Sequence, residues 1–313
     1  FDDIVFSSNF IIKSPRCDMF NFYPHTKSRE EFENRLIKEF PFIKKETIGK
    51  SLVNRNIEAF TIGNKNKKII MVGGVHGSEY LTINLLYKFL WQLGCSYRDG
   101  SEVAGIKMKR YLHRRGVTII PCVNPDGTDI NLLGSSSANE YSSLINYICP
   151  HSCIWQSNAR GVDINHNFPA NWEEIHKREI ALGISAPHNT RYGGKTPSSE
   201  PETISLMNYC IKQNFSRCYA FHSQGREIYY TFGDETPKDS KTMARLLART
   251  CNYKLSTPPS IANGGGFKDW FIHRFNKPGF TFEIGKGENP LPLSDLEEEY
   301  KILQKALCLA VII

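Results

Sequence analysis

Four short apolar runs, each followed by polar or ionisable residues, dominate the hydrophobic pattern of this chain. They are Lys68–Val72, Gly116–Pro121, Cys218–Phe221 and Gly279–Phe282. Continuous apolar runs of this length are typical of strands that are buried on both faces of a sheet. A more polar, strand-like stretch over residues 44–62 precedes them. The pattern therefore predicts a central sheet whose strands end in groups capable of chemistry.

Helical periodicity fills the segments between the predicted strands. Residues 28–40 place their apolar side chains on one side, as an amphipathic helix does. Residues 81–93 repeat the pattern and stop at Gly94, a residue typical of helix ends. Ser294 and Glu297 have capping-box spacing and predict the start of a last helix that runs to the end of the chain.

Strands that alternate with helices predict an α/β fold. We expect a single three-layer α/β/α domain with a mixed, mostly parallel central sheet over residues 28–313, and residues 1–27 as an N-terminal extension. In such sheets the ligand site lies beyond the carboxyl ends of the strands. His76, His222 and Glu283 fall at those ends.

Composition and charge narrow the class of protein. The 313 residues are 40% hydrophobic, as in globular proteins, and the net charge of +7 is scattered without the basic tract typical of nucleic-acid binding. Because no apolar run approaches about 20 residues, we expect no membrane span. No signal peptide is visible, which favours a cytoplasmic protein, although the chain starts without Met and secretion stays open.

Cysteine usage adds one expectation about redox state. Nine irregularly spaced cysteines indicate reduced thiols in a reducing compartment and not a disulfide framework. Cys149, His151 and Cys153 form the tightest cluster. They supply three ligands and no obvious fourth, so a second metal site there is disfavoured.

Three residues at the strand ends carry the candidate chemistry. His76 and Glu79 form an HxxE pair, which can grip one metal ion, although a capped helix start with Glu79 in its first turn is an alternative. His222 adds a second imidazole, and two nitrogens with one carboxylate are the ligand set of catalytic zinc peptidases. Glu283 is a candidate general base, and a salt bridge to Lys286 is the alternative.

Six sequence blocks in order resemble those of the zinc carboxypeptidases of the A/B type. The blocks are Gly74–Glu79, Asn124–Gly127, Gly161–Phe168, Ser199–Thr203, His222–Ser223 and Phe280–Glu283. The resemblance implies one zinc ion per chain, bound by His76, Glu79 and His222. It also implies that Glu283 takes a proton from the zinc-bound water, whose pKa the metal lowers.

The sequence departs from this family at the substrate side. Asn165-His166 stands where the family has Asn-Arg to hold the substrate's carboxylate, so the bidentate arginine fork is lost. Aligning Trp155 with the family's tryptophan puts Gln156 where the arginine facing the oxyanion would lie, and Arg160 is a candidate replacement.

A further block, Gly265–Trp270, resembles the family's Gly-Gly-x-x-Asp-Trp stretch. In that register Ile261 replaces the family's capping tyrosine, and Lys268 lines the specificity pocket. We therefore expect Lys268 to meet an anionic substrate side chain, with a solvated surface lysine as the alternative.

Two stretches, His222–Tyr230 and Glu283–Pro292, resemble the bacterial γ-D-glutamyl-meso-diaminopimelate peptidases, which act on peptidoglycan stem peptides. The resemblance implies hydrolysis of that amide bond, a peptide or muropeptide partner, and Tyr230 as a further substrate contact. An ordinary metallocarboxypeptidase and a catalytically silent zinc protein that binds wall fragments are the alternatives. The sequence does not determine the oligomeric state.

Overall fold

The computed structural model describes residues 18–64, 66–150 and 154–313. Within these ranges eight strands form one mixed sheet in the order β1-β2-β4-β3-β5-β8-β6-β7. The strands are β1 Lys44–Lys50, β2 Asn56–Gly63, β3 Lys68–Val72, β4 Gly116–Ile120, β5 Cys218–Ser223, β6 Glu227–Tyr229, β7 Lys254–Leu255 and β8 Gly279–Ile284. The four central strands, β4, β3, β5 and β8, are parallel to one another, which confirms the α/β class with a mostly parallel sheet.

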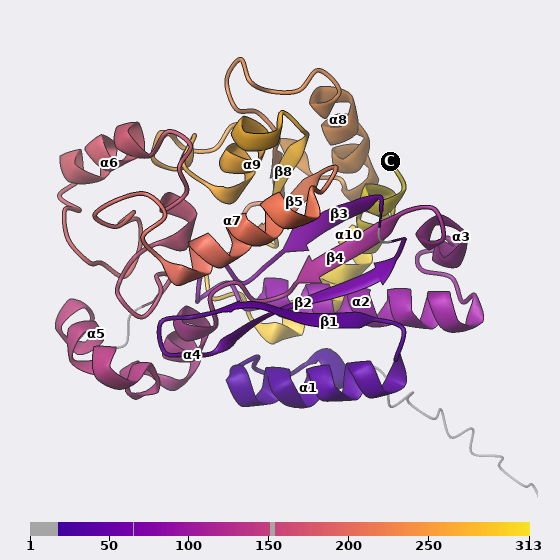
Figure 1. Ribbon diagram of the computed structural model, residues 1–313, viewed down its shortest axis with the longest axis horizontal. Coiled ribbons are helices and arrows are strands. Elements are labelled where there is room, and N and C mark those ends of the chain that lie inside the picture. Colours follow the sequence, from indigo (N-terminus) through magenta and orange to yellow (C-terminus); the bar gives the residue numbers. More distant parts are fainter. Residues whose placement is uncertain (1–17, 65, 151–153) are drawn as a thin grey trace, which may run out of the picture.

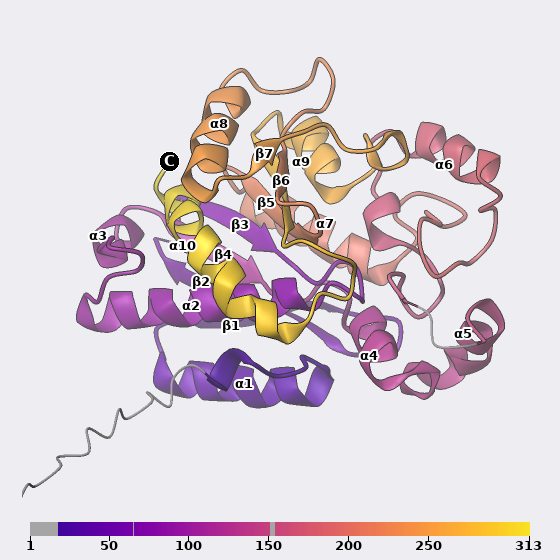
Figure 2. The same cartoon turned by 180° about the vertical axis from the view of Figure 1, so that it is seen from behind.

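Helices cover both faces of the sheet (Figures 1 and 2). The longer ones are α1 Thr26–Glu39, α2 Leu81–Asp99, α6 Trp172–Ala181, α7 Pro201–Gln213, α8 Ser240–Cys251 and α10 Leu296–Ile312. Shorter ones are α3 Met108–Leu112, α4 Pro125–Leu133, α5 Ser142–Ile148, α9 Phe267–Phe275 and the 3-10 turns Asp18–Phe20, Ser135–Tyr141, Ile164–His166, Ser260–Ala262 and Leu293–Asp295.

Alternation along β5 separates two apolar cores. Tyr219 and Phe221 belong to the core shared with α1, α2, α8 and α10. Cys218 and Ala220 point to the opposite side and belong to the core shared with α7 and α9. Because successive side chains of a strand alternate between faces, an apolar run without polar breaks is buried on both. This arrangement is the expected three-layer architecture.

The second helix is longer than the sequence pattern predicts. It continues through Gly94 to Asp99 and ends at Gly100, whose φ of 80° is left-handed. A Cβ added at Gly94 would lie 2.7 Å from the ring of Phe40. Glycine at this position therefore permits α2 to approach Phe40 closely, and the prediction that the helix ends there is wrong.

The start of the last helix also differs from its prediction. Helix α10 begins at Leu296, and its N-cap Asp295 makes no capping hydrogen bond through its side chain. Glu297, the expected partner in a capping box with Ser294, forms an ion pair with Lys88 of α2 instead. A tertiary contact has replaced the local one.

The described part of the expected N-terminal extension, residues 18–27, is packed against the domain. Phe20 is buried in the core beside α1 and α2. The Asn84 amide of α2 donates to the carbonyl oxygens of Phe20 and Phe22, at 2.7 Å each. Helix α1 begins at Thr26, so the fold includes residues before position 28.

The cysteines agree in part with the expected reduced state. Among the described residues, five cysteines have free thiols: Cys122, Cys210, Cys218, Cys251 and Cys308. Cys149, in contrast, forms a disulfide, which corrects the expectation at that position. His151 and Cys153 of the tight cluster lie outside the described residues. None of the described helices is long and apolar enough to cross a membrane.

Candidate metal centre

The HxxE pair lies in the turn that joins β3 to α2. The chain leaves β3 through Gly74, whose φ of 55° is left-handed and whose added Cβ would meet Ile83 at 2.8 Å. The Glu79 amide then donates to the carbonyl oxygen of His76 at 3.1 Å. Helix α2 begins two residues later, at Leu81. The turn, and not a helical surface, brings the two side chains together.

The other two predicted residues lie on adjacent strands. His222 of β5 is the direct register partner of Glu283 of β8. Strand β5 also pairs with β3, the strand that leads into the HxxE turn. Because parallel strands end at the same edge of a sheet, the three segments deliver their side chains to one place.

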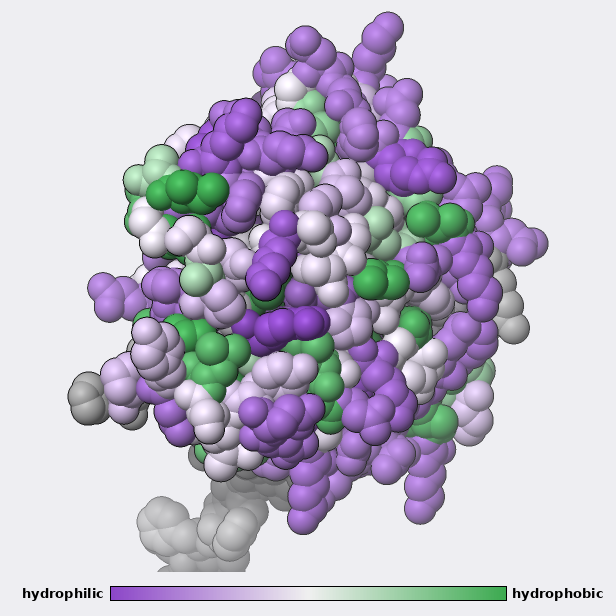
Figure 3. Space-filling model, turned by 60° about the vertical axis from the view of Figure 1, so that its left-hand side comes forward, coloured by the Kyte–Doolittle hydropathy of each residue, from purple (hydrophilic) through white to green (hydrophobic). Residues whose placement is uncertain are grey.

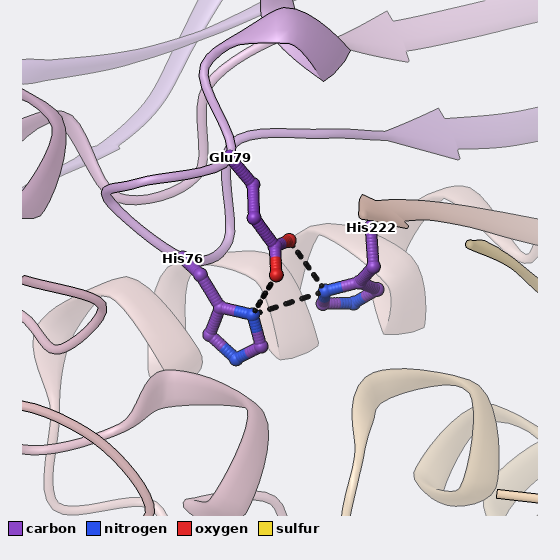
Figure 4. Close-up of side chains that lie close together, drawn as sticks. All are labelled: His76, Glu79 and His222. Carbon is purple, nitrogen blue, oxygen red and sulfur yellow. Dashed lines mark hydrogen bonds and ion pairs between the residues drawn. The ribbon is translucent and has the colours of Figure 1, made fainter. Parts of the chain in front are cut away.

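The side chains of His76, Glu79 and His222 converge (Figure 4). The Glu79 carboxylate contacts His76 Nδ1 at 2.8 Å through one oxygen and His222 Nδ1 at 3.0 Å through the other. The two Nδ1 atoms are 3.2 Å apart. One ligand atom from each of the three residues lies within 4.8 Å of the others, an arrangement that could hold a metal ion.

The donor chemistry of this group fits zinc. Two imidazoles and one carboxylate form the open ligand set of catalytic zinc sites. Two imidazole nitrogens that face each other at 3.2 Å cannot both carry a proton, and a shared cation satisfies both lone pairs. Glu79 and His222 are buried, with relative exposures of 3% and 2%. A cation among them would therefore interact with its ligands in a largely water-excluded place.

Asp163 holds the outer side of His76. Its Oδ1 lies 3.2 Å from His76 Nε2, and its Oδ2 accepts the backbone N–H of Arg191 at 2.8 Å. Burial alone would raise the pKa of Asp163, but the positive charges of His76 and His166 outweigh burial and lower that pKa below its usual range. A carboxylate on the far nitrogen fixes the tautomer and orientation of a metal-binding histidine. Asp163 lies in the Gly161–Phe168 block, but no pattern in the sequence indicates this role.

Glu283 faces the same cavity without a partner of its own. None of the described residues donates a hydrogen bond to its carboxylate or forms an ion pair with it, so the alternative of a salt bridge to Lys286 is not seen. Burial, and then the negative charge of Glu79, raise the pKa of Glu283 well above its usual value. A carboxyl group held this way is suited to accept a proton.

A cavity of about 540 Å³ surrounds the four residues. Its lining includes His76, Glu79, Ile154, Gln156, Asp163, Asn165, His166, Thr190, Arg191, His222, Tyr229, Ile261 and Glu283. The predicted substrate contacts Gln156, Asn165 and His166 are thus brought to the metal centre, as is Ile261. Figure 3 brings forward the side that carries α4, α5 and α6, where hydrophilic residues run across the middle of the face between apolar patches.

Three predicted substrate contacts do not line this cavity. The Arg160 guanidinium pairs with Glu200 at 3.2 Å. The ammonium of Lys268 is buried, donates to the carbonyl oxygen of Thr231 at 2.6 Å and pairs with Asp269. Its charge is therefore neutralised within the protein, contrary to both sequence interpretations. Tyr230 packs against the core, while its neighbour Tyr229 lines the cavity.

Glu179 supports His166 and was missed in the sequence. His166 Nδ1 lies 2.8 Å from one oxygen of this fully buried carboxylate. The other oxygen contacts His176 Nδ1 and accepts the Gly193 backbone N–H, both at 3.1 Å. Because an ionised carboxylate only accepts, it keeps a proton on His166 Nδ1. No spacing pattern connects α6 to the block that contains His166, so only the fold reveals this pair.

Arg191 is a second cavity residue without a sequence signal. It lies on an irregular segment with a left-handed φ of 65°, and it is exposed. The Asp163 carboxylate fixes its backbone N–H. A guanidinium at the cavity wall offers a partner for an anionic group, the role that Arg160 and Lys268 were expected to fill.

Comparison with known proteins gives matches over most of the chain. The model of the zinc carboxypeptidase family matches residues 30–306. Gamma-D-glutamyl-L-diamino acid endopeptidase 1 of Lysinibacillus sphaericus is 34% identical over 267 residues. The aligned part is 84% of this chain and 65% of that protein, so the chain spans slightly less than two thirds of this relative's length.

Solved structures share the fold. Bovine thrombin-activatable fibrinolysis inhibitor superposes with a TM-score of 0.74 at 18% identity, over 93% of this chain and 97% of that one. Murein-tripeptide amidase from Escherichia coli O157 superposes with a TM-score of 0.53 at 23% identity, over 84% of this chain and 91% of that one.

Proposed function

This chain belongs to the zinc carboxypeptidase family, and on that premise we propose that it hydrolyses the γ-D-glutamyl bond to a diamino acid in bacterial cell-wall stem peptides. The diamino acid we infer is meso-diaminopimelate. The 34% identity to a γ-D-glutamyl-L-diamino acid endopeptidase over 84% of the chain supports this substrate class. The whole protein's activity is part of the proposal.

The observation that carries the proposal is the His166–Glu179 pair at the cavity. A digestive-type carboxypeptidase holds its substrate's carboxylate with a bidentate arginine, and the sequence has no arginine at this position. Here a histidine lines the cavity, supported 2.8 Å away by a fully buried carboxylate. We infer that this arrangement serves a substrate whose carboxylates are placed differently from those of an ordinary peptide.

The residues divide the mechanism between them. His76, Glu79 and His222 would hold the metal, and Asp163 would orient His76 through its Nε2. Zinc bound there would supply Lewis acidity, which polarises the scissile carbonyl and acidifies water. Glu283 would take the proton from the attacking water and deliver it to the leaving amine.

The substrate's charges require partners around this centre. Asn165 and His166 are the proposed contacts for one carboxylate, and Gln156 is the proposed donor toward the developing oxyanion. Arg191, which lines the same cavity, is our candidate for the second carboxylate of diaminopimelate. Lys268 is left out of this role because Asp269 and Thr231 already occupy its ammonium.

The test compares two substrates on one preparation. L-Ala-γ-D-Glu-meso-diaminopimelate and an ordinary L-peptide with a free carboxyl terminus would each be incubated with zinc-loaded protein, and the products measured by mass spectrometry. We expect release of diaminopimelate that stops when a chelator removes zinc. Faster trimming of the ordinary peptide would refute the proposed substrate and favour a common carboxypeptidase. No hydrolysis of either would favour a silent binding protein.

A further inference from the structure

A second cavity lies at the opposite end of the sheet, where the central strands begin. Its volume is about 510 Å³, and it is lined by Asn66, Lys67, Lys68, Ile69, Arg114, Arg115, Asn214, Ser216 and Arg217. In Figure 1 this end of the sheet carries α3 and the C-terminus, while α5 and α6 lie at the other end. The lining shares no residue with the metal-centre cavity.

Parallel strand starts explain why cations gather here. Lys68 opens β3 and is in register with Gly116 of β4, which Arg114 and Arg115 precede directly. Arg217 is the residue before β5, the other neighbour of β3. Five of the nine lining residues are lysine or arginine, and none is acidic. The scattered surplus of positive charge in the sequence is therefore locally concentrated.

Arg217 is the buried cation of this lining, and part of its guanidinium lacks hydrogen-bond partners. Its exposure is 7%, and its Nε and Nη2 atoms are buried without a hydrogen-bond partner among the described residues. A buried guanidinium loses its hydration, and this loss is costly unless an anion or acceptors replace the water. Nothing in the lining supplies such an anion.

Arg115 is a second arginine of this cavity and is repelled by Arg217. It donates from Nη1 to the backbone carbonyl oxygen of Ile313. Partial burial, and then repulsion from Arg217, lower the pKa of Arg115. The two guanidinium groups therefore repel each other, and no Asp or Glu lines this cavity, a situation that a bound dianion would relieve.

We propose that this cavity binds a small molecule through a phosphate group. Planar guanidinium groups match phosphate oxygens in pairs, and several cations suit a dianion better than a single carboxylate. The volume exceeds the needs of a lone phosphate and falls in the range of small-ligand sites. Asn66, Asn214 and Ser216 offer polar side chains to the rest of such a molecule. The proposal does not depend on the peptidase activity.

Thermal unfolding in matched buffers tests the proposal. The melting temperature would be compared in potassium chloride, in inorganic phosphate and in glucose 6-phosphate with glucose, all at one ionic strength. We expect phosphate-bearing solutes to raise it by about 4 °C. A larger rise at equal concentration with the sugar phosphate would identify an esterified ligand, and an equal rise would identify free phosphate as sufficient.

The Arg217→Met variant provides the decisive comparison. In chloride it should melt no lower than the wild-type protein, because an unpartnered buried charge has been removed. It should lose the phosphate-dependent rise. Lys241→Gln, which removes an exposed cation on α8 that does not line the cavity, should keep this rise.

Two results would overturn the site. One is an unchanged wild-type melting temperature in every phosphate arm; the other is an equal rise in wild type and Arg217→Met, which would place the anion elsewhere. If the variant does not fold, Lys67→Gln and Arg114→Gln at the exposed rim replace it. Each should weaken the apparent phosphate affinity severalfold, and unchanged affinity in both would equally refute the site.

Discussion

The two ends of the parallel strands differ in how their charged side chains are paired. At the carboxyl end, histidines and carboxylates are matched, because Glu79 contacts both His76 and His222 and Asp163 contacts the other side of His76. At the amino end, lysines and arginines gather without any acid in the lining. The same strands β3 and β5 connect the two ends.

Each end nevertheless leaves polar groups unsatisfied among the described residues. At the carboxyl end these are the carboxylate of the half-buried Glu283, which faces the cavity with no donor, and the buried Nε2 of His222. At the amino end it is Arg217, with two buried nitrogens that lack acceptors. Buried polar groups are normally satisfied, so an exception marks a place where a proton or a ligand completes the structure. Paired charges therefore hold the side chains of a site in place, and unpaired charges indicate which proton or ligand the site binds.

The largest effect should follow from removing the unmatched carboxylate. Glu283→Gln keeps the size of the side chain and loses the proton acceptor, so turnover of the stem tripeptide should fall by about 10³-fold or more. Zinc content, measured by atomic absorption, should stay at the wild-type level. Kinetics by mass spectrometry would measure the loss.

Glu227 offers a matched control for this substitution. It is the antiparallel register partner of Glu283 on β6, and it accepts a hydrogen bond from Tyr229 at 3.1 Å. Glu227→Gln should retain most of the activity because Glu227 does not line the cavity. Equal losses in the two variants would show that general negative charge, and not a base at position 283, drives the reaction.

The common position of His76, Glu79, His222 and Glu283 at the carboxyl end of the strands was predictable from the sequence for a physical reason. His222 and Glu283 lie at the ends of apolar runs, and parallel strands carry such ends to one edge without any knowledge of loops. His76 and Glu79 follow a third run closely enough to share that edge. Local pattern therefore predicted the sheet, its class and the common edge of these four residues, whereas their roles as metal ligands and base came from the family resemblance and stay predictions.

Contacts between distant loops were not accessible in the same way. Glu179 reaches His166 from α6, and no periodicity predicts this contact. The family resemblance placed Lys268 at the specificity pocket, but its ammonium pairs with the adjacent Asp269. An alignment register alone does not show the direction of a side chain. The basic cavity was hidden because its cations come from three separate segments, Lys67-Lys68, Arg114-Arg115 and Arg217, and form no tract.

A smaller effect should follow from weakening a matched pair at the substrate side. Glu179→Gln removes the carboxylate that holds His166, so binding of a substrate carboxylate should weaken and KM should rise about tenfold. The value of kcat should change less, because neither residue contacts the metal ligands Glu79 and His222. Steady-state kinetics on the stem tripeptide separate the two parameters.

His176 supplies the control for that variant. It contacts the second oxygen of Glu179 at 3.1 Å but does not line the cavity. His176→Gln should leave KM within about twofold of the wild-type value, because it leaves the His166 contact in place. A tenfold rise in KM for this variant too would mean that Glu179 acts by stabilising α6 and not by positioning His166.

The last effect is on stability and concerns a buried acid whose charge is removed by a bound proton. Glu202 is fully buried, accepts the Leu52 backbone N–H at 3.2 Å and the Asn158 amide at 3.3 Å, and has no ion pair among the described residues. Burial, followed by the negative charge of Asp126, raises the pKa of Glu202 from 4.5 to about 8. It is thus an unmatched group in the sense of Glu283 and Arg217, resolved by protonation.

This raised pKa has a definite sign in a stability measurement. Between pH 4.5 and about 8 the folded state keeps a proton on Glu202 that the unfolded state releases. The contribution of Glu202 to stability is therefore complete below pH 4.5 and is lost as the pH rises through 8. Glutamine at this position stays neutral at every pH. Between pH 5 and 9 the free energy of unfolding of Glu202→Gln should therefore fall by about 1–3 kcal/mol less than that of the wild-type protein. Urea unfolding at pH 5 and pH 9 measures the difference in the free energy of unfolding. Equal losses in the two proteins would show that Glu202 is ionised in the folded state. An unpaired buried charge would then persist here without a ligand or a proton.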